Sequence, residues 1–180
     1  MHNLATIHRP HVTLVPASRP RREARPVVRA AAPADVAEIH ELVSRFAADR
    51  LMLPRTESQI ALGLDGYVVV ADAHDRVLAC AALDEYSPSL AEVSSVAVDP
   101  SRLGEGLGSA AVLGVERVAR RRGIAEIFAL TLADGFFGSL GYEKTDLVLY
   151  PEKLARYEAL RSAGVQVVPK SCFRKIVGDN

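Results

Sequence analysis

The spacing of apolar residues changes along the chain and predicts the order of its elements. Between residues 36 and 46, apolar residues recur every three or four positions, which indicates an amphipathic helix. Pro54 ends this helix, and Thr56 is suited to cap a short second helix. A meander of three antiparallel strands is then expected, with a turn at 73–76, over residues 67–71, 77–83 and 90–98.

The second half of the chain continues the alternation of helices and strands. A helix with apolar residues at three- and four-residue spacing begins near Ala110, and the strand that follows it at 127–132 completes a βαβ unit. The pattern therefore predicts an α+β fold with a mixed antiparallel and parallel sheet flanked by helices. The other predicted elements are a first strand at 27–29, a short helix ended by Gly141, a strand through Val148, a helix over 154–160, and extended segments at 165–168 and 173–177.

Residues 1–26 differ in composition from the rest of the chain. They hold five arginines against one glutamate, with four prolines among them. Prolines and unpaired charge disfavour a packed element, so we expect a mobile tail before a domain that spans residues 27–180. An arginine-rich, acid-poor start would also suit a transit peptide, but no long amphipathic helical period supports that alternative.

The charge of the whole chain narrows the classes of partner. The sequence has 22 basic and 22 acidic residues, so its formal net charge is zero, which argues against an electrostatic nucleic-acid binder. Cys80 and Cys172 form neither a metal-ligand pair nor a disulfide framework, and we expect both to be buried in a protein of the reducing cytoplasm. No apolar run approaches the length of a membrane span, no secretory segment is seen, and no metal site is predicted.

The segment after the third meander strand carries the strongest functional signal. The strand ends at Asp99-Pro100, and glycines then recur at positions 104, 106 and 108 before a helix begins. Glycines let the backbone approach a ligand, and a helix start presents unpaired N–H groups, so the segment suits a phosphate or pyrophosphate. The spacing fits neither a Walker loop, because Ser109-Ala110 follows the last glycine, nor a dinucleotide fingerprint.

Three motifs together resemble the acyl-CoA loop of the GCN5-related N-acetyltransferases, the GNAT superfamily. They are Val-Ala-Val-Asp-Pro at 96–100, Gly-x-Gly-x-Gly at 104–108, and Ala-Arg-x-x-Gly-Ile at 119–124. Leu103 departs from the family, which usually has Gln or Arg before the first glycine, and Phe137 stands where many members carry a tyrosine general acid. The resemblance implies the GNAT fold, acetyl-CoA as co-substrate, and contacts to CoA from Val96, Ala97, Val98, Leu103, Gly104, Glu105, Gly106, Leu107, Gly108 and Ser109.

Further segments sharpen this resemblance toward one group, the acetyltransferase domain of bacterial N-acetylglutamate synthases in the form without an amino-acid-kinase domain. They include Leu-Pro-Arg-Thr at 53–56, Leu-Ala-Glu-Val-Ser-Ser-Val-Ala-Val at 90–98, and Leu-Tyr-Pro-Glu-Lys at 149–153. The resemblance implies an enzyme that acetylates the α-amine of L-glutamate, which is the first step of arginine biosynthesis.

The resemblance also implies roles for individual residues. Glu92 would be the general base, acting through water, and Thr131 would protonate the leaving thiolate. Arg55 would bind one substrate carboxylate as a bidentate fork, and backbone groups near Ser95 would complete the substrate cradle. The second carboxylate site is expected near the C-terminal strand, where the candidates are Lys170, Ser171 and Arg174, with Lys153 or Lys175 as competitors.

Plainer interpretations of the same residues stay open. Glu92 could be an exposed strand residue or an ion-pair partner, Thr131 a threonine packed on a sheet, and Arg55 a solvated surface arginine. The same fold could acetylate another small amine, such as a polyamine, an antibiotic or a protein N-terminus, or it could be a non-catalytic CoA-binding regulatory module. The expected partners are small molecules, without nucleic acid or a membrane, and a homodimer is left open.

Overall fold

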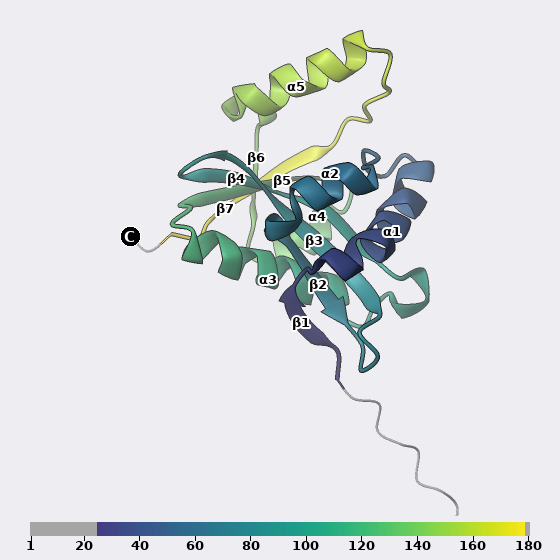
Figure 1. Ribbon diagram of the computed structural model, residues 1–180. Helices are drawn as coiled ribbons and strands as arrows, with labels where there is room; N and C mark the ends of the chain where they lie inside the picture. The colour runs from purple at the N-terminus through teal and green to yellow at the C-terminus, as the bar shows by residue number, and fades with distance from the viewer. Residues whose placement is uncertain (1–24, 179–180) are drawn as a thin grey trace, which may run out of the picture.

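The computed structural model of the chain describes residues 25–178, which fold around one sheet of seven strands (Figure 1). Within this sheet β4 and β5 pair in parallel, and every other pair of neighbours is antiparallel. The predicted α+β fold with a mixed sheet is therefore confirmed. In their order across the sheet, the strands are β1 (Val27–Ala30), β2 (Tyr67–Ala71), β3 (Val77–Ser87), β4 (Leu90–Val98), β5 (Glu126–Thr131), β7 (Ser171–Ile176) and β6 (Glu143–Thr145).

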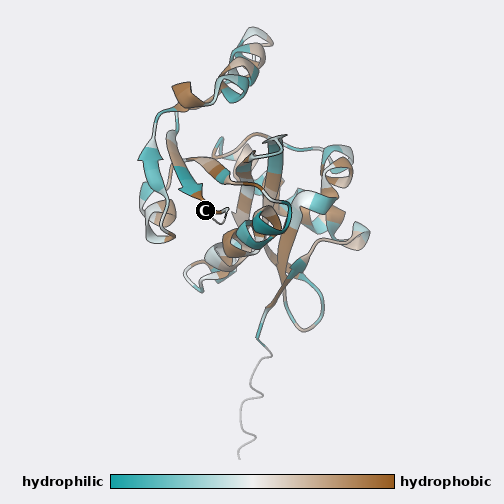
Figure 2. Ribbon diagram, turned by 90° about the vertical axis from the view of Figure 1, so that its left-hand side faces the viewer, coloured by the Kyte–Doolittle hydropathy of each residue, from teal (hydrophilic) through white to brown (hydrophobic). Residues whose placement is uncertain are grey.

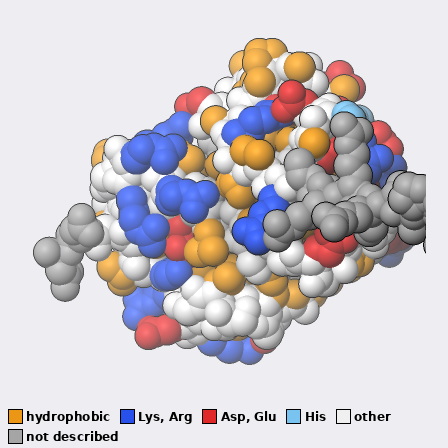
Figure 3. Space-filling view, turned by 90° about the horizontal axis from the view of Figure 1, so that it is seen from below, with side chains coloured by type: hydrophobic (Ala, Val, Ile, Leu, Met, Phe, Trp, Pro, Cys, Tyr) orange, Lys and Arg blue, Asp and Glu red, His pale blue; other side chains and the backbone are white. Residues whose placement is uncertain are grey.

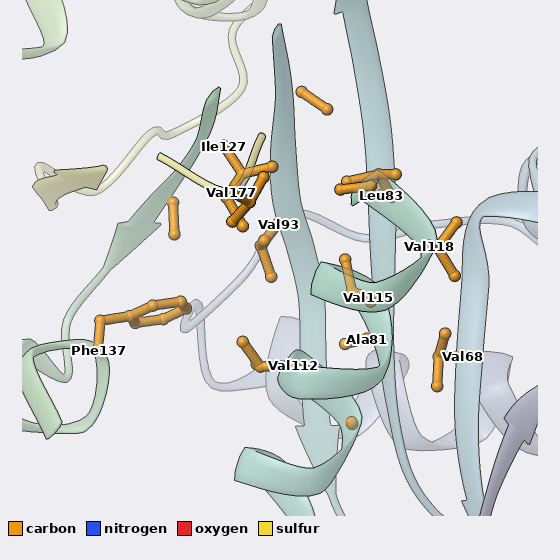
Figure 4. Close-up of a cluster of buried hydrophobic side chains, with 14 of the residues drawn as sticks. Val68, Ala81, Leu83, Val93, Val112, Val115, Val118, Ile127, Phe137 and Val177 are labelled. Atoms are coloured by element: carbon orange, nitrogen blue, oxygen red, sulfur yellow. The ribbon is translucent and has the colours of Figure 1, made fainter. Parts of the chain in front are cut away.

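Helix α3 (Leu107–Arg121) makes the crossover from β4 to β5 and covers one face of the sheet. Its side chains Val112 and Val115 are fully buried, and Figure 4 shows them directed toward the strands. A glycine at position 114 allows close packing, because a Cβ there would lie only 2.6 Å from Cγ1 of Val68. The absence of a side chain at Gly114 therefore lets α3 pack directly on Val68 of β2.

Helices α1 (Val36–Ala48) and α2 (Glu57–Leu62) cover the opposite face. Ile39, Val43 and Ile60 are buried there against alternate side chains of β2, as the predicted helical spacing requires. Thr56 caps α2 as predicted, because its hydroxyl accepts a hydrogen bond from the Gln59 N–H at 3.2 Å. Figure 2 shows the hydrophobic strands enclosed between these helices and α3, with hydrophilic residues on the outer helix faces.

The C-terminal third holds α4 (Asp134–Ser139) and α5 (Pro151–Ser162), and one expectation for it was wrong. The strand predicted through Val148 stops at Thr145, because the Asp146 carboxylate accepts a hydrogen bond from the Val148 N–H at 3.0 Å and starts a 3-10 turn. The segment 165–168, predicted to be extended, belongs to no strand and connects α5 to β7. The short 3-10 helices are η1 (Pro33–Asp35), η2 (Leu64–Gly66), η3 (Pro100–Arg102) and η4 (Leu147–Leu149).

The surface of the described residues mixes charges of both signs. Arg117, Arg120 and Arg121 are exposed on the C-terminal half of α3, and Figure 3 shows Lys and Arg side chains gathered to one side of the lower face with acidic side chains among them. Cys80 and Cys172 are buried free cysteines, as predicted. Across residues 25–178, no helix has both the length and the apolar character needed to cross a membrane. Most of the predicted tail, residues 1–24, lies outside the described residues, so its role stays a prediction.

Candidate active site

A cavity of about 130 Å³ lies where four separate segments of the chain meet. Its walls combine apolar side chains with one carboxylate and several cations. The lining residues are Leu51, Met52, Leu53 and Arg55 from the α1–α2 connection, Glu92, Val93, Ser94, Ser95 and Val96 from β4, Leu130, Thr131, Leu132 and Phe137 from the stretch between the end of β5 and α4, and Lys153, Tyr157 and Lys170 from the C-terminal third.

The cavity exists because β4 and β5 separate. Their parallel pairing runs from Leu90 opposite Glu126 only as far as Glu92 opposite Phe128. Beyond that point β4 is irregular, and Ser95 has a φ of 51°, a left-handed conformation that is uncommon outside glycine. Residues 92–96 of β4 and residues 130–131 of β5 therefore line the opening between the two strands.

Glu92 is buried at the base of this opening, with 4% of its surface exposed. Its Oε2 accepts hydrogen bonds from Lys153 Nζ at 2.7 Å and from the Tyr86 hydroxyl at 3.0 Å. Burial and the neighbouring Glu92 carboxylate raise the pKa of Tyr86, so this hydroxyl stays protonated and donates. The ion pair that the sequence left as an alternative is present, and Glu92 nevertheless lines the cavity.

Arg55 is held at the rim of the cavity and is not a solvated surface arginine. Its side chain is 18% exposed, and its Nη2 donates to Asp84 Oδ2 at 2.6 Å. Ser94 Oγ donates to the same carboxylate oxygen at 3.0 Å. The guanidinium is thus oriented from β3, and the fork has further N–H donors for a carboxylate in the cavity.

Of the other residues predicted to bind substrate, Ser95 and Lys170 line the cavity. Lys170 Nζ donates to the Leu51 carbonyl at 2.7 Å, and burial lowers the pKa of this lysine. Ser171 does not line the cavity, because its hydroxyl donates to Asp134 at 3.0 Å. Arg174 lies farther along β7, opposite Phe128, and is also absent from the lining.

The two competing lysines lie in different places. Lys175 points to the α3 side of the sheet, where it pairs with the buried Glu116 at 2.9 Å. Lys153 lines the cavity, and its ammonium contacts Glu92. The sequence had suggested Lys153 only as an alternative candidate for binding the second substrate carboxylate. Sequence reasoning missed Asp84, Tyr86 and Tyr157, since no local pattern ties them to Glu92.

Thr131 ends β5 at the cavity wall. Its Oγ1 accepts a hydrogen bond from the Ala133 N–H at 2.8 Å, which orients the hydroxyl and leaves its own proton for another acceptor. Phe137 also lines the cavity and brings no hydroxyl, in agreement with the sequence. Thr131 is therefore the hydroxyl that β5 offers at this wall.

The glycine-rich loop turns directly into α3. Gly104 and Gly106 have φ values of 82° and 78°, and the first helical hydrogen bond runs from the Ala110 N–H to the Gly106 carbonyl. The N–H groups of residues 107–109 precede that bond and have no acceptor within the helix. These backbone donors fit a pyrophosphate, and β4 leads from them to the cavity. No group of three or more His, Cys, Asp or Glu in residues 25–178 is arranged to hold a metal ion.

The fold and this arrangement agree with the comparison to known families. The sequence profile of the acetyltransferase (GNAT) family matches residues 35–142. The chain belongs to this family. It is therefore an N-acetyltransferase that uses acetyl-CoA as its acetyl donor, and the resemblance inferred from the acyl-CoA loop is confirmed.

Relatives of this GNAT enzyme include both general and amino-acid acetyltransferases. It is 33% identical over 129 residues to an uncharacterized N-acetyltransferase of Chlorobaculum tepidum, covering 72% of this chain and 83% of the relative. It is also 33% identical over 127 residues to an amino-acid acetyltransferase of Mycobacterium tuberculosis, covering 69% and 72%. Against the longer amino-acid acetyltransferase of Mannheimia succiniciproducens, identity is 26% and the match spans 33% of the relative's length.

Solved structures give the same fold. Rv2747 from Mycobacterium tuberculosis, crystallised with CoA, superimposes with a TM-score of 0.73 at 26% identity, covering 84% of this chain and 99% of that one. The N-acetylglutamate synthase of Neisseria gonorrhoeae, complexed with CoA and N-acetyl-glutamate, gives a TM-score of 0.74 at 22% identity, covering 87% and 36%. The second likeness shows the fold alone.

Proposed function

We propose that this acetyltransferase transfers the acetyl group of acetyl-CoA to the α-amine of L-glutamate. The observation that carries the proposal is the pair of cations, Arg55 and Lys170, in one cavity with the carboxylate of Glu92. Glutamate brings two carboxylates and one ammonium, which these three side chains complement. The relatives named as amino-acid acetyltransferases support the same class of acceptor.

The side chains of the cavity divide the reaction between them. Glu92 accepts a proton from the substrate ammonium through a water molecule, which frees the nitrogen lone pair. The nitrogen then forms the amide bond to the acetyl carbon as the carbon–sulfur bond breaks, and the second proton of the nitrogen leaves through water to solvent. Thr131 donates its hydroxyl proton to the departing sulfur and regains one from solvent. The N–H groups at residues 107–109 would hold the pyrophosphate of the donor.

The charges at the rim favour an acidic acceptor. Asp84 neutralises one side of Arg55, but the guanidinium keeps unused donors, and Lys170 bonds a neutral carbonyl. Two cationic groups are thus present for two carboxylates, while a polyamine would meet them as like charges. We further propose, from the relatives named as amino-acid acetyltransferases, that the enzyme acts in arginine biosynthesis in the cytoplasm.

One assay tests the substrate. Thiol release from acetyl-CoA is measured with the full chain and a panel of L-glutamate, L-glutamine, L-aspartate, spermidine and a peptide N-terminus. We expect kcat/KM to be highest for glutamate. A higher value for spermidine or the peptide would overturn the proposal in favour of another amine. CoA binding without transfer to any acceptor would favour the regulatory module that the sequence left open.

A further inference from the structure

Helix α5 carries a buried lysine whose ammonium lies on Glu92. Lys153 is 4% exposed, and its Nζ lies 2.7 Å from Glu92 Oε2, although the two residues are 61 positions apart in the sequence. Lysine is seldom buried without a partner, because an unpaired charge is costly to remove from water. The contact therefore couples a distant helix to the carboxylate proposed as the base.

The two donors that reach Glu92 use the same oxygen. Tyr86 and Lys153 both donate to Oε2, and Oε1 receives no hydrogen bond from the described residues. Among the described residues, Tyr142 Oη is the one side-chain polar atom that is fully buried and has no hydrogen-bond partner. Glu92 Oε1 also has no partner among these residues, so it is not fully buried, and it is open to the cavity that Glu92 lines. One carboxylate oxygen is anchored, and the other is free to meet a water molecule or an amine.

Helix α5 contributes its buried side chains to the cavity wall and not to the hydrophobic core. Of its 12 residues only Lys153 and Tyr157 are buried, and both line the cavity. The Lys153 Nζ lies 4.8 Å from the centre of the Tyr157 ring, a cation–π distance. Figure 1 shows α5 apart from α1 and α3, which cover the two faces of the sheet.

We propose that Lys153 is a positioning residue, which orients Glu92 through Oε2 and supplies the counter-charge of its buried carboxylate, so that Oε1 can accept a proton. The inference rests on the proposed role of Glu92 as general base. A buried carboxyl without a cation favours its protonated form, and a protonated carboxyl cannot act as the base. Lys153 supplies that cation without occupying the oxygen that faces the cavity.

Other groups around Glu92 do not replace this cation. Tyr86 from β3 and Tyr157 from α5 are neutral phenols, and Cys172 on β7 is a neutral thiol whose pKa burial raises to about 12. Arg156 of α5 is a cation beside the Tyr86 hydroxyl, but within residues 25–178 no hydrogen bond or ion pair joins it to Glu92. Asp84, opposite Glu92 on β3, is negative and is paired with Arg55. Lys170 is a second cation in the cavity, but its ammonium bonds the Leu51 carbonyl and not Glu92.

The test compares Lys153→Met and Lys153→Arg with the wild type over a range of pH. The amine kcat/KM is measured at saturating acetyl-CoA, and CoA affinity confirms that each variant is folded. In Lys153→Met we expect the acid limb of the profile to move up by about 1–3 pH units, so that the loss is largest at low pH. Lys153→Arg should keep the limb near its wild-type position. Lys144→Met removes an exposed ion pair with Asp134 and is the matched control, with no shift expected.

A loss of equal size at every pH in Lys153→Met would overturn the inference, since it would leave Lys153 a merely structural role. Wild-type turnover in Glu92→Gln would overturn it as well. Should Lys153→Met not fold, Lys153→Gln is measured in its place, and the same two outcomes decide. The pH profile is measured with the amine that reacts best. If its acid limb shifts in Lys153→Met but glutamate is inactive, only the proposal that glutamate is the substrate is refuted. An unshifted limb with glutamate as the best amine refutes only the role of Lys153.

Discussion

The Arg55 guanidinium and the Asp84 carboxylate lie 2.6 Å apart, and this ion pair joins the α1–α2 connection to β3 at the rim of the cavity. Asp84 is also bonded by Ser94, so both partners are held in place before any substrate arrives. A guanidinium fixed in this way loses little further freedom when it binds a carboxylate. Arg55 is therefore suited to select the acceptor.

Arg55→Ala should raise the glutamate KM strongly and leave the acetyl-CoA KM little changed. Loss of a charge-assisted contact in a partly desolvated site weakens substrate binding by roughly 2–4 kcal/mol. Steady-state kinetics with each substrate varied in turn measure both constants. Arg45→Ala removes an exposed helix arginine paired with Glu41 and should change neither constant. Equal changes in both constants for Arg55→Ala would return Arg55 to a surface role.

Much of the fold was predictable because its signals are local. The run from β4 through Asp99-Pro100 and the glycines to α3 contains its own strand, breaker, turn and helix patterns, and the structure follows it closely. The strand predicted through Val148 failed for an equally local reason, because Asp146 caps the following turn. The local hydrogen bond to the Asp146 carboxylate stabilises the turn more than the β propensity of Val148 favours a strand.

The candidate site was predictable only in part, because several of its contacts join distant segments. Arg55, Glu92, Ser95, Thr131 and Lys170 line one cavity, and the roles that the resemblance implies for them stay predictions. Lys153 belongs to the motif at 149–153 and was a candidate for a carboxylate site, but no local pattern indicates that it pairs with Glu92, because the two residues are 61 positions apart. Ser171 was misplaced for a similar reason. Its partner Asp134 is 37 residues away, and only the folded chain brings the two together.

Gly106→Val should abolish CoA binding in a folded protein. Gly106 has a φ of 78° at the start of α3, where a β-branched residue is strained by about 1–3 kcal/mol, which would turn the N–H groups of the loop away from the pyrophosphate. Gly123→Val is the matched control. Its φ is 74°, it is equally open, and it follows the other end of α3, so its strain should lower stability without changing CoA affinity. Calorimetric titration with CoA measures this, and unchanged affinity in Gly106→Val would refute the pyrophosphate site.

Removal of residues 1–26 should leave the fold and the activity nearly intact. The segment has no apolar periodicity to bury, and β1 begins at Val27, immediately after the cut. Thermal unfolding, acetyl transfer and size-exclusion chromatography compare the truncated and full chains. Insolubility, inactivity or a change of oligomeric state would show that the tail packs on the domain or joins an interface between subunits.

Because of Lys170, raising the pH into the alkaline range should increase the stability of the enzyme and weaken its binding of glutamate. Burial lowers the pKa of Lys170, so between that pKa and the ordinary lysine value the unfolded chain holds a proton that the folded chain has lost. Stability therefore rises with pH across this window, while the cavity loses a cation and the glutamate KM rises. Unfolding free energies and KM values from about pH 8 to about pH 10 should show both trends relative to Lys170→Met. A KM that changes identically in the wild type and the variant would remove Lys170 from the substrate site.

Glu92→Gln should lower turnover about 10²–10⁴-fold while acetyl-CoA binding is retained. The glutamine keeps the shape of the side chain but cannot accept the proton of the substrate ammonium, which is mostly protonated at neutral pH. The loss should shrink as pH rises and free amine becomes abundant. Glu126→Gln offers a control, because its carboxylate accepts a hydrogen bond from Tyr150 at 2.7 Å and does not line the cavity. Among the described residues, no other carboxylate lines this cavity. Near-normal turnover of Glu92→Gln at neutral pH would therefore show that a group other than a cavity carboxylate, or bulk solvent, takes the proton.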